Sequence, residues 1–319
     1  MALVFVHGIK GGRLRDSTGL RWVGAKQALG LDRRRLELPL TWEGDRQGVD
    51  GCTPDGPISS VLGVSVYKPF LTWARERFAT FVPFSYDWRR ELPEAVERLT
   101  ETLNAAAMKD GDAPLVVAHS MGGLVTLLTL RERPHLASGV LFAGVPFGTG
   151  IAFAEDVTDG TKAGLGSRPL DARAHNTWSA HWIFFPTDGS GINAEMDWYD
   201  PAAWEANKLG IYARSGIDLE PYRAHHAIAM SKARKRRSEA EDPGKLAGAD
   251  LPIAILRSRA QAVPTLVRGT DTTPGDGRVR WEATEPPGVD FEAFETKLPH
   301  DKLLDDADAV QAALEYVRG

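Results

Sequence analysis

The sequence predicts an α/β fold in which a mostly parallel sheet is flanked by helices. Short, wholly apolar runs such as residues 3–6 and 139–143 are typical of strands that are buried on both faces of a parallel sheet. Segments with apolar residues at helical spacing alternate with these runs, and this alternation favours a parallel arrangement. Two interruptions predict a lid excursion at about 41–65 and a largely helical inserted cap at 150–250.

The other elements of the expected core, which comprises residues 1–149 and 251–319, follow from local patterns. A helix is expected over residues 19–30 and a second strand over 36–40, before the Gly-, Asp- and Pro-rich excursion. The remaining expected elements are a helix at 66–78, a strand at 81–86, a helix that begins at Pro93, strands at 252–256 and 291–298, and a terminal helix at 303–317.

A strand-to-helix junction carries the strongest chemical signal. The apolar run 115–118 precedes Ser120, and a helical pattern begins at Gly122, so that small residues stand two positions before and after the serine. This is the nucleophile-elbow pattern with Ala118 in place of its first glycine. The backbone N–H of Met121 would lie at a helix N-terminus, where it could stabilise an oxyanion. The alternative is a plain strand-to-helix turn.

A serine nucleophile needs a base and an acid, which in this kind of fold follow it in the order acid, histidine. His300 comes after the last expected strand and is the candidate base; a helix-capping histidine is the alternative. Asp276 lies between glycines in a sharp turn and is the preferred acid, with Asp271 as the second candidate and a purely structural Asp-Gly turn as the alternative. The Gly-rich turn after the first strand offers the N–H of Ile9 as a second oxyanion donor, unless that turn has no function.

The expected cap is rich in aromatic residues. Trp178, Trp182, Phe184 and Phe185 are the candidates for the wall of a substrate pocket. The favoured alternative is that the aromatic residues pack inward as the cap's own core.

Composition limits the class of protein. The chain has 319 residues, and 43% of them are hydrophobic, which is ample for a large core. Its net charge of −5 gives no indication of nucleic-acid binding. The basic run 232–237 is followed by acidic residues and reads as an exposed mixed-charge helix. A single cysteine, Cys52, excludes an intrachain disulfide, and the four cap histidines lack a metal-ligand spacing, so we expect no metal and no cofactor. No run is long enough to span a bilayer, and a cytoplasmic location is expected, whereas the oligomeric state stays open.

Several motifs together resemble the lecithin:cholesterol acyltransferase family of α/β-hydrolases. The most specific are Tyr-Asp-Trp-Arg at 86–89 and Gly-Asp-Gly-Arg-Val at 275–279, which stand on either side of the elbow at 118–123. The His-Gly turn at 7–8, the turn at 143–148 and the late His300 complete the set. The departures are Arg278, where the family usually has Thr, and Cys52, which lacks the partner of the family's lid disulfide.

The resemblance implies a Ser-Asp-His enzyme that transfers acyl groups. Ser120 would attack an ester carbonyl, Asp276 and His300 would be acid and base, and Ile9 and Met121 would hold the oxyanion. It further implies a buried ion pair between Asp87 and Arg89.

We therefore expect a serine esterase or lipase that acts on small-molecule or lipid esters, or an O-acyltransferase that passes the acyl group to an alcohol. The alternative is a non-catalytic relative that binds an apolar ligand or partner. Transient membrane-surface contact through cap aromatics and the run 232–237 is compatible with the enzyme.

Overall fold

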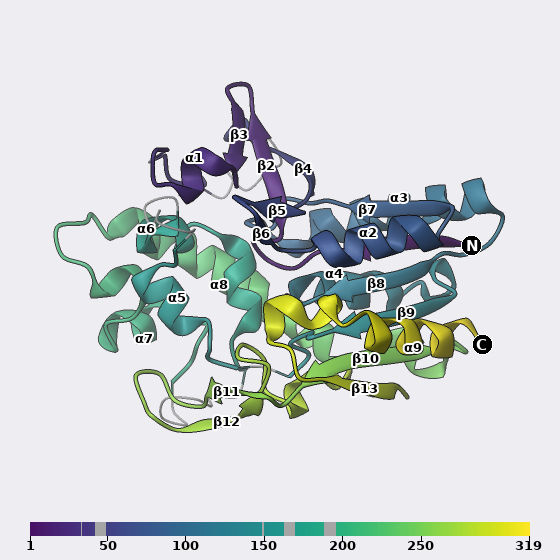
Figure 1. Ribbon diagram of the computed structural model, residues 1–319. Coiled ribbons are helices and arrows are strands. Elements are labelled where there is room, and N and C mark those ends of the chain that lie inside the picture. The colour runs from purple at the N-terminus through teal and green to yellow at the C-terminus, as the bar shows by residue number, and fades with distance from the viewer. Residues whose placement is uncertain (33, 42–48, 149, 163–169, 188–195) are drawn as a thin grey trace.

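The computed structural model describes residues 1–32, 34–41, 49–148, 150–162, 170–187 and 196–319. Its centre is a six-stranded sheet with the order β13-β10-β9-β8-β1-β7, in which every neighbouring pair is parallel (Figure 1). The strands are β1 (Ala2–Val6), β7 (Thr80–Phe84), β8 (Leu115–His119), β9 (Gly139–Ala143), β10 (Ile253–Ser258) and β13 (Glu292–Thr296). The predicted α/β-hydrolase class is confirmed.

Both faces of the sheet are covered, because alternate side chains of each strand point to opposite sides. Leu3 and Phe5 pack with α2 (Lys68–Arg77) and α9 (Ala307–Arg318), whereas Val4 and Val6 pack with α3 (Leu92–Asp110) and α4 (Met121–Leu130). Every residue of β1, β8 and β9 is buried, which explains why these strands read as continuous apolar runs.

The strand order fixes where a site can form. From β1 the chain goes to β7 on one side, and then crosses to β8 on the other side of β1. The carboxyl ends of β1 and β8 therefore border a topological switch point, where open α/β sheets form their ligand crevice. Ser120 follows β8 and the His7-Gly8 turn follows β1.

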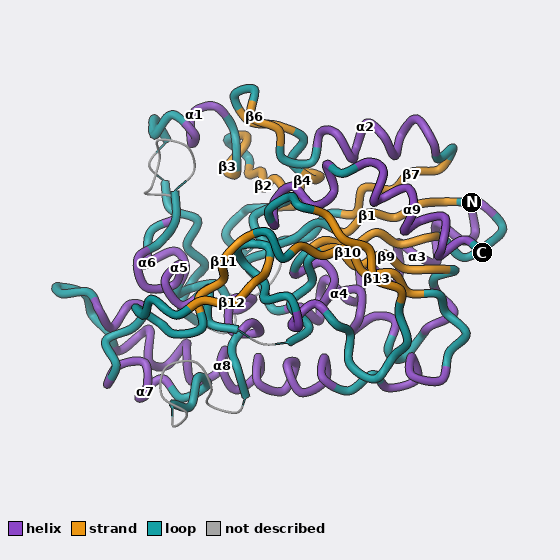
Figure 2. The backbone as a smooth tube through the Cα atoms, turned by 60° about the horizontal axis from the view of Figure 1, so that its bottom comes forward, coloured by secondary structure: helices purple, strands orange, loops and turns teal. Residues whose placement is uncertain are grey.

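Helices fill the described chain between β9 and β10. They are α5 (Ala154–Asp159), α6 (Ala172–His175), α7 (Pro201–Ala206) and α8 (Glu220–Glu241), with 3-10 turns at Ser179–Phe184, Gly210–Ala213 and Gly244–Gly248. In Figure 1 α5, α6 and α7 lie beyond one end of the sheet, and Figure 2 shows α8 as one long helix. The described residues of this insertion form helices and loops without a strand, as expected for a helical cap.

The helix predicted over residues 19–30 is wrong. Residues 19–22 form β3 (Gly19–Trp22), which pairs antiparallel with β2 (Gly12–Asp16), and only α1 (Ala25–Ala28) is helical. The missed signal is the turn between these strands. The Asp16 carboxylate accepts from the N–H and the hydroxyl of Thr18, at 2.7 and 2.6 Å, and Gly19 has a φ of +120°.

The strand predicted over residues 36–40 is also wrong. Leu36 and Leu38 are buried, but their backbone groups bond to side chains of the insertion instead of to a sheet. The indole of Trp178 donates to the Leu36 carbonyl at 2.8 Å, and the Leu38 N–H donates to the Thr177 hydroxyl at 2.9 Å.

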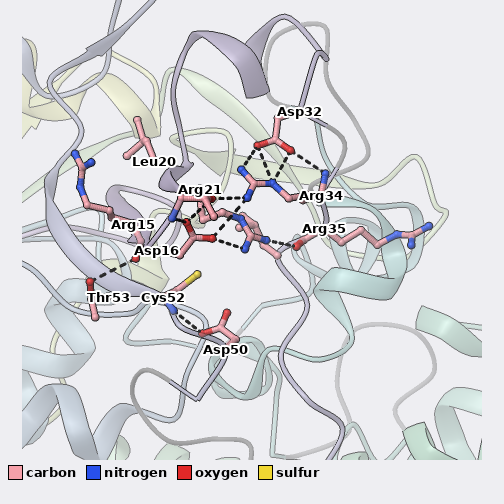
Figure 3. A network of polar contacts seen from close by, with 12 residues as sticks. Arg15, Asp16, Leu20, Arg21, Asp32, Arg34, Arg35, Asp50, Cys52 and Thr53 are labelled. Carbon is pink, nitrogen blue, oxygen red and sulfur yellow. Dashed lines mark hydrogen bonds and ion pairs between the residues drawn. The ribbon is translucent and has the colours of Figure 1, made fainter.

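The expected lid excursion at 41–65 is partly sheet, and its residues 42–48 lie outside the described residues. β4 (Thr53–Pro57) pairs with β2, and β5 (Ser60–Val61) forms a hairpin with β6 (Val64–Ser65). Figure 3 shows a network of arginines and aspartates from residues 15–35 beside this region, which the Thr53 hydroxyl joins by donating to the Arg15 carbonyl at 3.4 Å. In the excursion itself the N–H of Cys52, a buried free cysteine, donates to Asp50 at 3.1 Å.

The remaining elements complete the core. β11 (Gln261–Pro264) and β12 (Thr272–Gly275) form a separate antiparallel pair, and 3-10 turns lie at Pro134–Leu136, Glu282–Thr284 and His300–Asp305. None of the helices in the described ranges combines the length and apolar character needed to cross a membrane.

Buried histidines set the acid stability of this fold. Six of the eight histidines are buried: His7, His119, His175, His181, His225 and His226. Burial lowers the pKa of His225 to about 4 and that of His226 to about 3, although a backbone hydrogen bond opposes the shift in each case. These side chains are therefore neutral in the folded protein.

Acidification should destabilise the protein well above the pH at which carboxylates titrate. A histidine with a pKa of 6.5 when unfolded and about 4 when folded takes up its proton first in the unfolded state, so stability falls as pH falls through 6.5 and the loss continues to about pH 4. Each such histidine contributes about 1.4 kcal/mol per pH unit. Thermal denaturation between pH 7.5 and 5 measures the slope, which His225→Gln should reduce. The exposed His135→Gln is the control, and equal slopes in both variants would contradict the prediction.

Candidate active site

Ser120 occupies a strained position between β8 and α4. Its φ is +53° and its ψ is −129°, and its side chain is buried. The elbow passes directly over the end of β1: a Cβ on Gly122 would lie 2.5 Å from the carbonyl oxygens of Val6 and His7. The small residue predicted after the serine is therefore required by the neighbouring strand.

His300 connects Ser120 to Asp276. Its Nε2 lies 2.9 Å from Ser120 Oγ, and its Nδ1 lies 2.8 Å from Asp276 Oδ2. With the proton on Nδ1, this nitrogen donates to the carboxylate and Nε2 accepts from the hydroxyl, which is the arrangement of a nucleophile, its base and an orienting acid. The His300 backbone N–H also donates to the Asp276 carbonyl at 2.8 Å.

The turn after β12 presents the Asp276 carboxylate. Its Oδ1 accepts from the N–H groups of Arg278 and Val279 at 2.9 and 2.7 Å, and Gly277 has a φ of +94°. Burial alone would raise the Asp276 pKa, but His300 and the two N–H donors outweigh it and hold the pKa below its ordinary value. Asp271, the second candidate acid, is exposed and is not among the groups that contact His300.

The expected oxyanion donors lie on either side of the serine. Met121 is the first residue of α4, and Ile9 lines the cavity at Ser120. Ile9 belongs to a tight turn that the Gly11 N–H closes on the Gly8 carbonyl at 3.0 Å.

Residues 86–88 support this glycine turn from below. The Tyr86 hydroxyl donates to the His7 carbonyl at 2.9 Å, and the Trp88 indole donates to the Gly12 carbonyl at 2.8 Å. The His7 ring stacks on Tyr86 at 4.6 Å, and burial lowers the His7 pKa to about 4. His7 is thus a structural residue of the turn.

The buried ion pair implied for the same segment is confirmed. Arg89 Nη2 lies 2.7 Å from Asp87 Oδ2, and its Nη1 also reaches Asp50 at 2.7 Å. Arg89 is fully buried, so the two carboxylates compensate a charge that would otherwise be very costly.

A hydrogen-bonded chain that the sequence did not reveal joins the turn after β1 to His300. The Gly8 N–H donates to the Tyr67 hydroxyl at 3.2 Å, and this hydroxyl lies 2.8 Å from His119 Nδ1. His119 Nε2 lies 2.9 Å from the His300 carbonyl. Burial lowers the His119 pKa to about 3, so the ring is neutral and carries its proton on Nε2 if Tyr67 donates to Nδ1. Tyr67 has no local signal in the sequence, because its role depends on contacts across 52 and 59 positions.

A cavity of about 540 Å³ opens at Ser120 and His300. Apolar residues of its wall include Ile9, Trp22 and Phe153. Its polar wall combines the charged residues Lys10, Asp156, Lys162, Arg278 and Asp301.

The aromatic residues proposed as a pocket wall lie elsewhere. Trp178, Trp182, Phe184 and Phe185 are at most 1% exposed, and none is among the described residues that line the cavity at Ser120. They pack inward instead: Trp182 meets Trp204 edge to face with ring centroids 5.0 Å apart. The favoured alternative, a core of the cap itself, describes their positions.

Comparison with known proteins agrees with these motifs. Residues 63–180 match the family model named Lecithin:cholesterol acyltransferase. The resemblance is confirmed over that range, which includes the elbow and the segment 86–89. An uncharacterised protein of Saccharomyces cerevisiae is 28% identical over 149 residues, which are 45% of this chain and 23% of the yeast protein. The match thus spans less than a quarter of that relative.

One of the similar solved structures shares the fold. A chain in the crystal structure of the Tle4-Tli4 complex aligns with a TM-score of 0.59 at 12% identity, covering 100% of this chain and 98% of the other. A Bacillus licheniformis lipase, BlEst2 in mature form, aligns with a TM-score of 0.43 at 11% identity over 99% and 91% of the two chains. At 12% identity the likeness to the chain of the Tle4-Tli4 complex concerns the fold alone.

The elbow geometry predicts the effect of one added methyl group. Gly122→Ala should lower the free energy of unfolding by roughly 1–3 kcal/mol, because the new Cβ meets rigid backbone of β1. Chemical denaturation measures the change. Gly248→Ala is the control, since its Cβ would meet no heavy atom within 4 Å. Equal stability of the two variants would contradict the close approach.

Proposed function

We propose that this protein is a serine hydrolase that cleaves carboxylic esters through an acyl-enzyme. The observation that carries the proposal is the hydrogen-bonded series Ser120–His300–Asp276, with distances of 2.9 and 2.8 Å. The family match over residues 63–180 supports, in general terms, action on lipid esters by hydrolysis or acyl transfer.

The proposed reaction has two halves. His300 Nε2 removes the Ser120 proton while Oγ attacks the ester carbonyl, and the N–H groups of Ile9 and Met121 stabilise the resulting oxyanion. The imidazolium then protonates the alkoxide of the leaving alcohol as the carbon–oxygen bond breaks, which leaves an acyl group on Ser120. Asp276, whose pKa is held low, stays ionised and stabilises the imidazolium.

Water or a second alcohol then attacks the acyl-enzyme while His300 takes its proton. The imidazolium returns this proton to Ser120 Oγ as the bond between Oγ and the acyl group breaks, which releases an acid or a new ester. Hydrolysis and O-acyl transfer therefore use the same residues and differ in the acceptor that reaches Ser120. In this proposal residues 150–250 act as a cap, because Phe153 and Leu170 contribute to the cavity wall and limit access of water.

An apolar groove supports an acyl or lipid ester as the substrate. A second cavity of about 330 Å³ shares Trp22 and Val66 with the cavity at Ser120, and Lys10 and Lys162 also line both cavities. The rest of its wall includes Ile58, Leu62 and Val64, of which Leu62 and Val64 are 55% and 67% exposed. An acyl chain that continued from Ser120 into this groove would be removed from water.

Two alternatives are a non-catalytic relative and a protein that contacts the membrane surface. A non-catalytic relative that binds an apolar ligand would have no need of the aligned Ser120, His300 and Asp276. Membrane-surface contact stays a prediction without its aromatic half, because the cap aromatics are buried. The positive charge of the run 232–237 is also partly neutralised, because Arg234 pairs with Asp197 and Arg237 pairs with Glu241.

Removal of any member of the series should abolish ester cleavage. We expect Ser120→Ala, His300→Gln and Asp276→Asn each to lower kcat by roughly 10³-fold or more on 4-nitrophenyl esters of rising chain length. Asp271→Asn is the matched control and should keep the wild-type rate, because that carboxylate is exposed. The proposed function would be refuted if Ser120→Ala kept its activity, or if the wild type cleaved none of the esters.

Tyr67→Phe should weaken the positioning of the base without removing it. Loss of the hydroxyl leaves the Gly8 N–H and His119 Nδ1 unpaired in a buried place, so the oxyanion turn and the His300 loop lose their connection. We expect kcat to fall about tenfold with KM nearly unchanged, since each buried hydrogen bond contributes about 1 kcal/mol. Phe81→Tyr, which adds one hydroxyl on β7 next to α2, is the control for altered packing. An unchanged kcat in Tyr67→Phe would exclude a positioning role.

A further inference from the structure

Three charged side chains from distant parts of the chain meet in the wall of the cavity at Ser120. Lys10 lies in the turn after β1, Asp156 lies on α5, and Arg278 lies in the turn that presents Asp276. Lys10 Nζ lies 3.4 Å from Asp156 Oδ2, and the Arg278 guanidinium pairs with both oxygens of the same carboxylate. Lys10 Nζ also lies 3.5 Å from the Thr161 hydroxyl.

The charges of this cluster do not balance. Two cations share one carboxylate, and all three side chains are mostly buried, with exposures of 21% for Lys10, 11% for Asp156 and 32% for Arg278. Around the rest of the cavity Lys162 and Asp301 offset each other. Burial and the nearby Arg278 charge lower the Lys10 pKa, although Asp156 opposes the shift. An additional anion would relieve this excess of positive charge.

Backbone strain at Lys10 and the packing of Arg278 on Phe153 hold the two cations of this cluster in place. Lys10 has a φ of +60° at the third position of the turn from Gly8 to Gly11, a place where glycine is favoured. The Trp22 indole holds this conformation by donating to the Lys10 carbonyl at 2.9 Å. The Arg278 guanidinium lies 4.7 Å from the centre of the Phe153 ring, which keeps its planar face fixed.

We propose that Lys10 and Arg278 form an anion subsite, so that the preferred ester carries a phosphate or carboxylate group beside its reacting carbonyl. This inference rests on the proposed function and names its substrate class. Asp156 orients both cations, and the anionic group of the substrate becomes their additional partner. Charge-assisted hydrogen bonds to a lysine and an arginine recognise both groups, so the test includes one ester of each kind.

The first experiment measures a ratio of kcat/KM for matched pairs of esters. For a carboxylate on the acyl part, 4-nitrophenyl hydrogen glutarate is compared with 4-nitrophenyl methyl glutarate. For a phosphate on the alcohol part, 2-(phosphonooxy)ethyl butanoate is compared with 2-hydroxyethyl butanoate. We expect at least one anionic ester to be preferred by about tenfold or more, with the preference falling as salt is raised.

Variants separate recognition from a merely structural ion bridge between α5 and the core. Lys10→Met and Arg278→Gln should each reduce the charged-to-neutral ratio by about tenfold. Arg278→Lys should recover part of it, because it keeps the charge but not the planar fork. Lys235→Met, which removes an exposed cation of α8, should leave the ratio unchanged. A ratio that stays at the wild-type value in both Lys10→Met and Arg278→Gln, or a wild type with no preference for either anionic ester, would overturn the subsite.

A binding measurement distinguishes failure of this inference from failure of the proposed function. Ser120→Ala is titrated with 2-(phosphonooxy)ethyl butanoate and with glutarate by calorimetry at low salt, and again with Arg278→Gln added. Binding that Arg278→Gln weakens about tenfold supports the subsite even if the wild type cleaves no ester. Ester cleavage without such binding and without a charge preference would retain the proposed function and refute the subsite.

Discussion

The site depends on the hydrogen bond of 2.9 Å between His300 Nε2 and Ser120 Oγ. Ser120 follows a central strand, whereas His300 follows β13 at the edge of the sheet, so its loop must return across β10 and β9. Both backbone polar groups of His300 are fixed: its N–H by the Asp276 carbonyl at 2.8 Å, and its carbonyl by His119 at 2.9 Å. The second contact comes from the residue beside the serine, so one end of the elbow positions the loop that supplies its base.

Two kinds of signal in the sequence revealed the residues of the site. Ser120 and Asp276 lie in sharp turns whose small or glycine neighbours are visible locally, and His300 was found from its place after the last expected strand. The strands of the sheet were equally readable, because burial on both faces leaves a continuous apolar run. The geometry then selects Asp276 over Asp271, since only its turn lies beside His300.

The features that could not be predicted depend on partners far away in the chain. Residues 36–38 have the composition of a strand, yet their backbone groups bond to the side chains of Arg89, Thr177 and Trp178, which lie 53 to 142 positions later and which no local pattern encodes. Tyr67 is equally invisible in the sequence. The cap aromatics failed as pocket residues for a different reason: a small insertion needs its own apolar interior, and large aromatic side chains provide it most readily. Polar residues near the start of the insertion line the cavity at Ser120 instead.

Arg278 contacts both Asp276 and the charged wall of the cavity at Ser120. Its backbone N–H bonds to one oxygen of Asp276 at 2.9 Å, while its side chain crosses the Phe153 ring to reach Asp156 on α5. The two contacts use different parts of the residue, so the position of the Asp276 carboxylate and the charge that Arg278 presents to the cavity depend on different partners.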